Sequence, residues 1–190
     1  MNDVIEFLNK FFETEAEAIK ASDVPDIETF NNKLEEMNKF LEKDVQNKLG
    51  LIPLNELKSE DYYNRVKNFP VPDPRFLFRI DTYDNKNHGK LYCCFVSDSN
   101  PDDWQAYLNL LVVSKIEGEF KVISVFFFSN KGGLDEKKWH FNAGNEEFME
   151  RIDGHYILNN NSLGERKEIK RLLEPSDDQD SMKEYNKDEI

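Results

Sequence analysis

Long apolar runs, a surplus of basic residues and a secretory leader are all missing from this chain of 190 residues. No apolar run approaches the roughly 20 residues that a membrane-spanning helix needs. The first residues, MNDVIEFLNKFF, lack the basic region and the small-residue cleavage site of a secretory signal, so we expect a cytoplasmic protein with no membrane partner. Basic residues number 25 against 38 acidic ones, for a formal net charge of −13. Nucleic acid is therefore excluded as a partner, because phosphate neutralisation needs a basic surface.

Metal, redox and nucleophilic chemistry also find little support. The two cysteines, Cys93 and Cys94, are adjacent, so on a strand they point to opposite faces and cannot bridge. The three histidines, His88, His140 and His155, have no partner at the spacing of metal ligands. The sequence holds no Gly-x-Ser-x-Gly elbow and no glycine-rich phosphate loop that opens a helix. We therefore expect no metal, no cofactor and no catalytic residues.

The negative charge is concentrated at the two ends of the chain. Residues 1–60 hold 14 acidic and 7 basic residues, residues 61–173 hold 17 and 16, and residues 174–190 hold 7 and 2. The last segment, EPSDDQDSMKEYNKDEI, has almost nothing apolar to bury and cannot offset the entropy of ordering it. The sequence predicts a single domain over 1–173 followed by an acidic, disordered tail over 174–190.

Two amphipathic helices are predicted before residue 50. In the first, Val4, Leu8 and Phe11 recur at three- and four-residue spacing, and the helix ends near Ser22. The second is predicted over 27–49, with apolar residues at Ile27, Phe30, Leu34, Met37, Leu41, Val45 and Leu49. A short third helix is predicted from Ser59 to Lys67.

From residue 76 the hydrophobic period changes from 3.6 to 2, which predicts strands. The expected strands cover 76–83, 90–97, 104–116, 119–129 and 137–142, with a hairpin loop at 85–89 and a tight turn at Glu117-Gly118. After residue 145 we expect two short helices, the second with a capping box at Ser162 and Glu165. Helices followed by a meander predict an α+β fold, with N-terminal helices packed on one face of a strongly curved antiparallel sheet of about five strands.

This order of elements resembles the cone-shaped nuclear transport factor 2-like fold. The resemblance covers residues 1–142 and rests on the element order and on the texture of the meander, DDWQAYLNLLVVSKIEGEFKVISVFFF. Within that superfamily, which includes ketosteroid isomerases and many binding modules, the chain looks most like immunity proteins of bacterial polymorphic toxin systems. The resemblance implies a cytoplasmic, non-catalytic module, monomeric or homodimeric, that binds a cognate protein toxin and neutralises it by occlusion.

The expected contact residues for such a toxin lie in exposed acidic loops. Acidic loops speed association with a basic partner by electrostatic steering, and a neighbouring aromatic residue can anchor the interface. The candidates for toxin contact are Asp98, Asp102, Asp103, Trp104, Glu117 and Glu119.

The alternative is a small-molecule-binding or isomerase-like enzyme that uses the interior of the cone. Its candidate lining residues are Asp81, Tyr107, Trp139 and His140, because a buried carboxylate or imidazole there could act as a general base. Most other interior positions are Phe, Leu, Ile or Val, a departure from the polar interior of the isomerase-like members. A third hypothesis is an adaptor domain whose acidic tail recruits a basic partner.

Overall fold

The computed structural model describes residues 1–22, 27–48, 76–97, 108–128, 139, 141–152 and 155–172. Its helices are α1 (Asn2–Ser22), α2 (Ile27–Asn38), α3 (Lys43–Lys48) and α6 (Asn160–Leu163), with one 3-10 helix, η1 (Glu146–Phe148). Its strands are β1 (Phe76–Asn85), β2 (Gly89–Ser97), β3 (Leu108–Ile116), β4 (Glu119–Phe128), β5 (Phe141–Gly144), β6 (Met149–Ile152), β7 (His155–Leu158) and β8 (Glu165–Arg171). The predicted third helix and the acidic tail lie outside the described residues.

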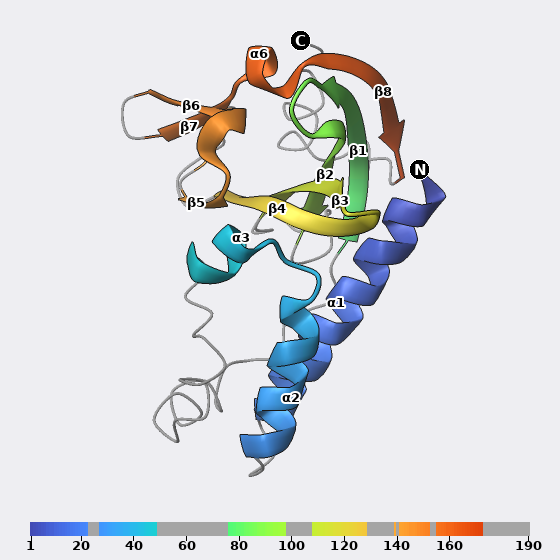
Figure 1. Cartoon of the computed structure of the whole chain (residues 1–190), viewed down its shortest axis with the longest axis vertical. Coiled ribbons are helices and arrows are strands. Elements are labelled where there is room, and N and C mark those ends of the chain that lie inside the picture. Colours follow the sequence, from blue (N-terminus) through green and yellow to red (C-terminus); the bar gives the residue numbers. More distant parts are fainter. Residues whose placement is uncertain are drawn as a thin grey trace, which may run out of the picture.

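Six strands form one antiparallel sheet in the order β5-β4-β3-β2-β1-β8, and β6 and β7 form a separate hairpin (Figure 1). The α+β prediction, with N-terminal helices and a large antiparallel sheet, is confirmed. The strongly curved, cone-like form is not confirmed, because the sheet is not strongly curled and β5 and β8 end it on either side. The predicted turn at Glu117-Gly118 is confirmed, with both residues at positive φ, 53° and 88°.

The sheet separates two apolar cores. The helix-side core joins α1, the α2–α3 segment and one sheet face; its fully buried members include Val4, Leu8, Val45, Ile80, Cys94 and Val113. The hairpin-side core joins η1, β6, α6 and the other face; its buried members include Phe78, Phe95, Leu110, Phe126, Trp139, Phe148 and Leu163. Residues 91–96 of β2 and 109–114 of β3 are buried throughout. Both faces of the central strands are therefore buried, where the sequence predicted one.

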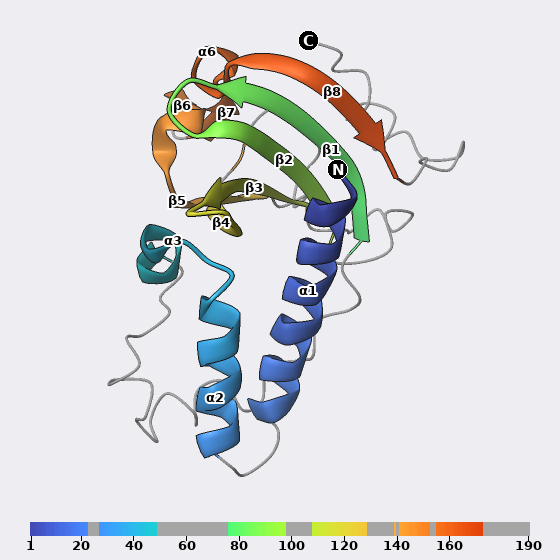
Figure 2. The same ribbon diagram turned by 45° about the vertical axis from the view of Figure 1, so that its right-hand side comes forward.

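The helices α1 and α2 lie side by side and extend well beyond the sheet (Figures 1 and 2). The single helix predicted over 27–49 is wrong, because the chain leaves the helix after Asn38 and starts α3 at Lys43. Between them the backbone joins β4: Val122 N donates to Phe40 O at 2.9 Å and Glu42 N donates to Val122 O at 2.8 Å. Val122 offers these groups beside a bulge in the β3–β4 ladder. These two sheet-type bonds outweigh the helical pattern of the sequence.

The C-terminal part of the sequence prediction is also wrong. Residues 165–171, ERKEIKR, were expected to form a helix capped by Ser162 and Glu165, and they form β8, antiparallel to β1. The short helix comes earlier, as α6, and its N-cap is Asn159, whose side chain accepts from the backbone N–H groups of Asn161 and Ser162. Pairing with the edge of β1 thus makes residues 165–171 a strand, although they are rich in helix-forming residues. Of the last predicted strand, 137–142, Phe141 and Asn142 belong to β5, which continues to Gly144, and residues 137, 138 and 140 lie outside the described residues.

The buried cysteines predict a loss of stability at alkaline pH. Burial raises the pKa of the Cys93 and Cys94 thiols. The negative charge of Asp81 adds a smaller increase for Cys93, and the neighbouring Cys93 and Asp81 add one for Cys94. A thiol whose pKa is raised by folding stabilises the protein below its unfolded pKa of about 8.5, and that contribution is lost as the pH rises. We expect the free energy of unfolding to fall by about 1.5 kcal/mol between about pH 8 and pH 9. Urea denaturation at both pH values measures the change in the free energy of unfolding. A C93A/C94A variant whose unfolding free energy falls by the same amount between these pH values would show that the two thiols do not cause the loss.

Candidate functional site

An open cleft of about 600 Å³ lies at one end of the sheet, where α3, the β1–β2 turn, the end of β3 and the β5–η1 junction meet. Its lining residues are Glu42, Asp44, His88, Ile116, Ile123, Gly144, Asn145 and Glu146. Three of them are acidic, one is a histidine, and none of the described lining residues is Lys or Arg. The cleft therefore combines an apolar patch with a negative rim.

The α3 side of the cleft is fixed by helix capping and by a close backbone approach. Glu42 Oε2 accepts from Asp44 N at 2.6 Å, at the start of α3. Gly144, at φ +96°, allows β5 to approach β4 and α3, since a Cβ there would lie 2.4 Å from Ile123 O and 2.6 Å from Val45 Cγ2. Asn145 N then donates to Ile123 O at 3.1 Å. This close packing holds Asp44, Asn145 and Glu146 around one space.

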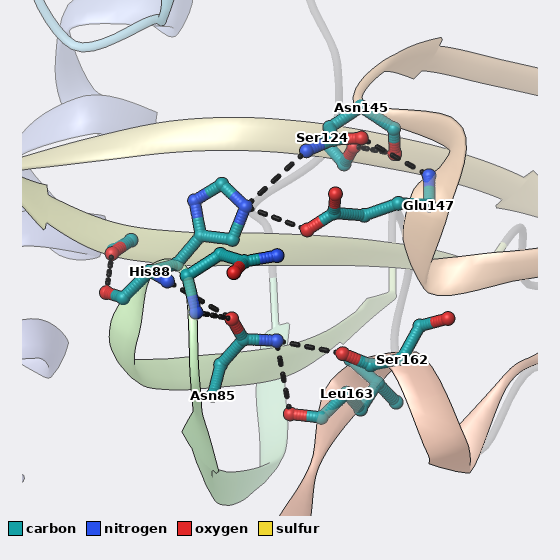
Figure 3. Close-up of polar contacts among 9 residues, drawn as sticks. Asn85, His88, Ser124, Asn145, Glu147, Ser162 and Leu163 are labelled. Atoms are coloured by element: carbon teal, nitrogen blue, oxygen red, sulfur yellow. Dashed lines mark hydrogen bonds and ion pairs between the residues drawn. The ribbon is translucent and has the colours of Figure 1, made fainter.

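His88 forms the opposite wall, and its ring is held in a fixed orientation (Figure 3). Its Nε2 lies 2.6 Å from Glu147 Oε1 and 3.5 Å from Asn145 Nδ2. An ionised carboxylate can only accept, so Nε2 carries the proton and donates to Glu147. The ring also packs edge-on against Phe148, with centroids 5.4 Å apart. Within the described part of the chain, His88 Nδ1 makes no hydrogen bond.

The backbone around His88 is fixed as well. Asn85 Oδ1 accepts from Asn87 N at 2.8 Å and His88 N at 2.9 Å, and Asn85 Nδ2 donates to Ser162 O at 2.6 Å (Figure 3). Ser114 Oγ donates to His88 O at 3.0 Å. Hydrogen bonds from side chains to backbone carbonyls therefore connect the β1–β2 turn to α6 and to β3.

A second ionisable pair lies inside the hairpin-side core. Arg79 Nε and Nη2 donate to the two carboxylate oxygens of Asp81 at 2.7 and 2.5 Å, and both side chains are buried. The Arg79 guanidinium also lies 5.0 Å from the centroid of the Phe95 ring. Asp81 thus faces the interior, as the enzyme hypothesis required. There it meets an arginine and aromatic rings, and its two oxygens are occupied by a bidentate ion pair.

The structure places the other predicted site residues as follows. Glu117 and Glu119 are exposed at the β3–β4 turn, directly after Ile116, which lines the cleft. Trp139 is buried in the hairpin-side core, directly before β5 in the chain. Asp81 lies on β1, and three strands separate β1 from β5 in the sheet. The remaining candidates lie outside the described residues: Asp98, Asp102, Asp103, Trp104, Tyr107 and His140.

Sequence reasoning missed the contact between His88 and Glu147. These residues are 59 positions apart, one in a hairpin turn and one in a 3-10 helix. The only local signals are the polar turn NKNHG and the segment NEEF, both of which are typical of exposed turns. Neither indicates its partner.

Comparisons with protein-family models, with curated proteins and with solved structures found no match to this chain. Among the described residues, no group of three or more His, Cys, Asp or Glu side chains could hold a metal ion. None of the described helices is long and apolar enough to cross a membrane.

Proposed function

We propose that this protein is a non-catalytic binding module, an immunity protein that neutralises a cognate bacterial toxin by occluding it. The observation that carries the proposal is the open cleft with three acidic lining residues, Glu42, Asp44 and Glu146, around an apolar patch. A surface of this kind complements a basic protein surface, since opposite potentials steer association and apolar contact supplies affinity. At the turn beside Ile116, Glu117 is also exposed, whereas the exposed Glu119 is paired with Lys121 Nζ at 3.2 Å.

The interior of the protein supports a binding role over catalysis. Side chains of Phe78, Phe95 and Phe126 fill the hairpin-side core, and Asp81 is engaged by Arg79. A catalytic carboxylate needs access to a substrate and freedom to exchange a proton. A carboxylate that is 1% exposed and bonded at both oxygens has neither. The isomerase-like alternative is correspondingly weaker.

The nuclear transport factor 2-like cone is part of the same proposal. Helices α1 to α3 before an antiparallel sheet support it, because that is the element order of the family resemblance. The strand β8 at the edge beside β1 and the β6–β7 hairpin are additions that the resemblance does not account for. We assign the protein to the cytoplasm, where an immunity protein meets its toxin.

Co-expression with the toxin encoded beside it tests the proposal. We expect the cells to survive, and the two proteins to elute from gel filtration as one complex, because occlusion requires a stable stoichiometric interaction. Cells that express the toxin with an unrelated acidic protein of similar size provide the control. A toxin that still kills, with no complex on gel filtration, would exclude the immunity function.

A further inference from the structure

We propose that the cleft beside His88 receives a single arginine side chain of the partner protein. This inference rests on the proposed function and names the chemistry of the contact. It assigns the interface to α3, the β1–β2 turn and η1, whereas the sequence had indicated the loop that includes Asp98 to Trp104 and the turn with Glu117 and Glu119. The cleft offers an apolar patch, acidic lining residues and a histidine ring in a fixed orientation.

The lining of the cleft fits the two halves of an arginine side chain. Ile116 is a large aliphatic residue that is 38% exposed, and it offers an apolar surface to the methylene stem. The other isoleucine of the lining, Ile123, is buried beneath the surface. Glu42 and Asp44 on the α3 side, and Glu146 on η1, line the same space and give it a negative charge. A guanidinium presents five N–H donors in a plane and can pair with carboxylates in a bidentate manner.

His88 supplies a flat wall that is already positioned. Its ring is held by Glu147 Oε1 at 2.6 Å and by the edge-on contact with Phe148, so little side-chain entropy remains to be lost on binding. Guanidinium groups stack on planar rings, which an ammonium group cannot do in the same way. The histidine wall therefore has its own carboxylate partner in Glu147, outside the lining of the cleft.

Other occupants fit less well. An anion would meet three carboxylates, and an apolar side chain would leave these carboxylates desolvated without a partner. A metal ion is disfavoured because the described His, Cys, Asp and Glu side chains form no group that could hold one. A lysine shares the charge but not the planar geometry.

Three short capped peptides, identical except for a central Arg, Lys or citrulline, test the inference on the full-length protein. Citrulline keeps the shape of arginine and removes its charge. In an NMR titration we expect the arginine peptide to shift the amide signals of Asp44, His88, Asn145 and Glu146 in a saturable way. We expect the citrulline peptide to give no saturable shift. Equal binding of the arginine and citrulline peptides would overturn the inference, as would equal binding of the lysine peptide.

A triple variant, E42Q/D44N/E146Q, removes the three charges and keeps the side-chain shapes, including an oxygen at residue 42 that can cap α3. We expect it to bind the arginine peptide at least about 5-fold more weakly, the effect of losing two to three exposed ion pairs. The matched control, E6Q/E13Q/E150Q, removes three exposed acids from α1 and β6 and should bind like the original protein. Equal weakening in both variants would show a non-specific charge effect and overturn the inference.

The co-expression assay separates failure of this inference from failure of the proposed function. If the triple variant, folded by its NMR spectrum, still protects cells as well as the original protein, the cleft is not the interface and the inference is overturned, while the immunity function stands. If neither protein protects or forms a complex, but the arginine peptide still binds with the expected preference, the immunity function fails and the arginine site is supported.

Discussion

Replacing Asp81 by alanine is expected to lower the free energy of unfolding by about 3–5 kcal/mol. The substitution leaves the Arg79 guanidinium buried in the hairpin-side core without its bidentate partner, at a position where its side chain is 7% exposed. The contact with the Phe95 ring cannot replace two charge-assisted hydrogen bonds. Urea denaturation at about pH 7, followed by circular dichroism, measures the change.

Removing both charges provides the control for the Asp81 substitution. In a double variant, R79M/D81L, both charges of the pair are removed, and apolar side chains of similar volume replace them. We expect this variant to recover most of the stability that D81A loses, and to fold even if D81A does not. A D81A variant within about 1 kcal/mol of the original protein would contradict the buried ion pair. A double variant as unstable as D81A would show that packing, and not charge, sets the cost.

Replacing Gly144 by alanine is expected to lower the free energy of unfolding by about 3 kcal/mol, from overpacking together with the strain of a positive φ. The new Cβ would lie 2.4 Å from the backbone oxygen of Ile123 and 2.6 Å from Val45 Cγ2, so β5 would have to move away from β4 and α3. Because Asn145 N bonds the same oxygen, the movement would also displace the η1 side of the cleft. Thermal and urea unfolding measure the first effect, and the arginine-peptide titration measures the second.

Gly118 offers a matched control for Gly144. It also has a positive φ, +88°, but a Cβ there would meet nothing within 4 Å. The substitution G118A should therefore cost only the backbone strain, about 1 kcal/mol, and should leave peptide binding unchanged. If G144A and G118A have equal effects, the close approach of β4, β5 and α3 at Gly144 does not contribute to stability.

The helical prediction over 27–49 shows what periodicity can and cannot determine. Phe30, Leu34 and Leu41 are buried, as their spacing predicts. The pattern reports which residues face the core, and it holds whether or not the helix is continuous. The break at residues 39–42 arises from hydrogen bonds to Val122, which lies some 80 residues later in the sequence. No local pattern carries that information.

In the segment 165–171, tertiary contacts also decide the type of secondary structure. Its Glu, Arg and Lys residues favour a helix in isolation. In the fold its backbone pairs with β1, from Arg79 opposite Arg171 to Asp84 opposite Glu165. Ile169 is the only large apolar residue of this segment, so the sequence has no hydrophobic period that would predict the strand. The charged side chains also suit an edge strand, because they discourage pairing with another chain.

The sequence by itself determined the α+β order, the two-residue turn at Glu117-Gly118 and the burial of apolar helix residues such as Val4, Leu8 and Phe30. These features depend on neighbours within a few positions, and composition and period therefore report them. Tertiary structure alone decided that Asp81 meets Arg79 in a filled core, and that His88 meets Glu147 beside Glu42 and Asp44. His88 and Glu147 are 59 positions apart, and Arg79 and Asp81, although only two positions apart, are buried by elements from elsewhere in the chain. The local order of residues encodes neither the first contact nor the burial of the second.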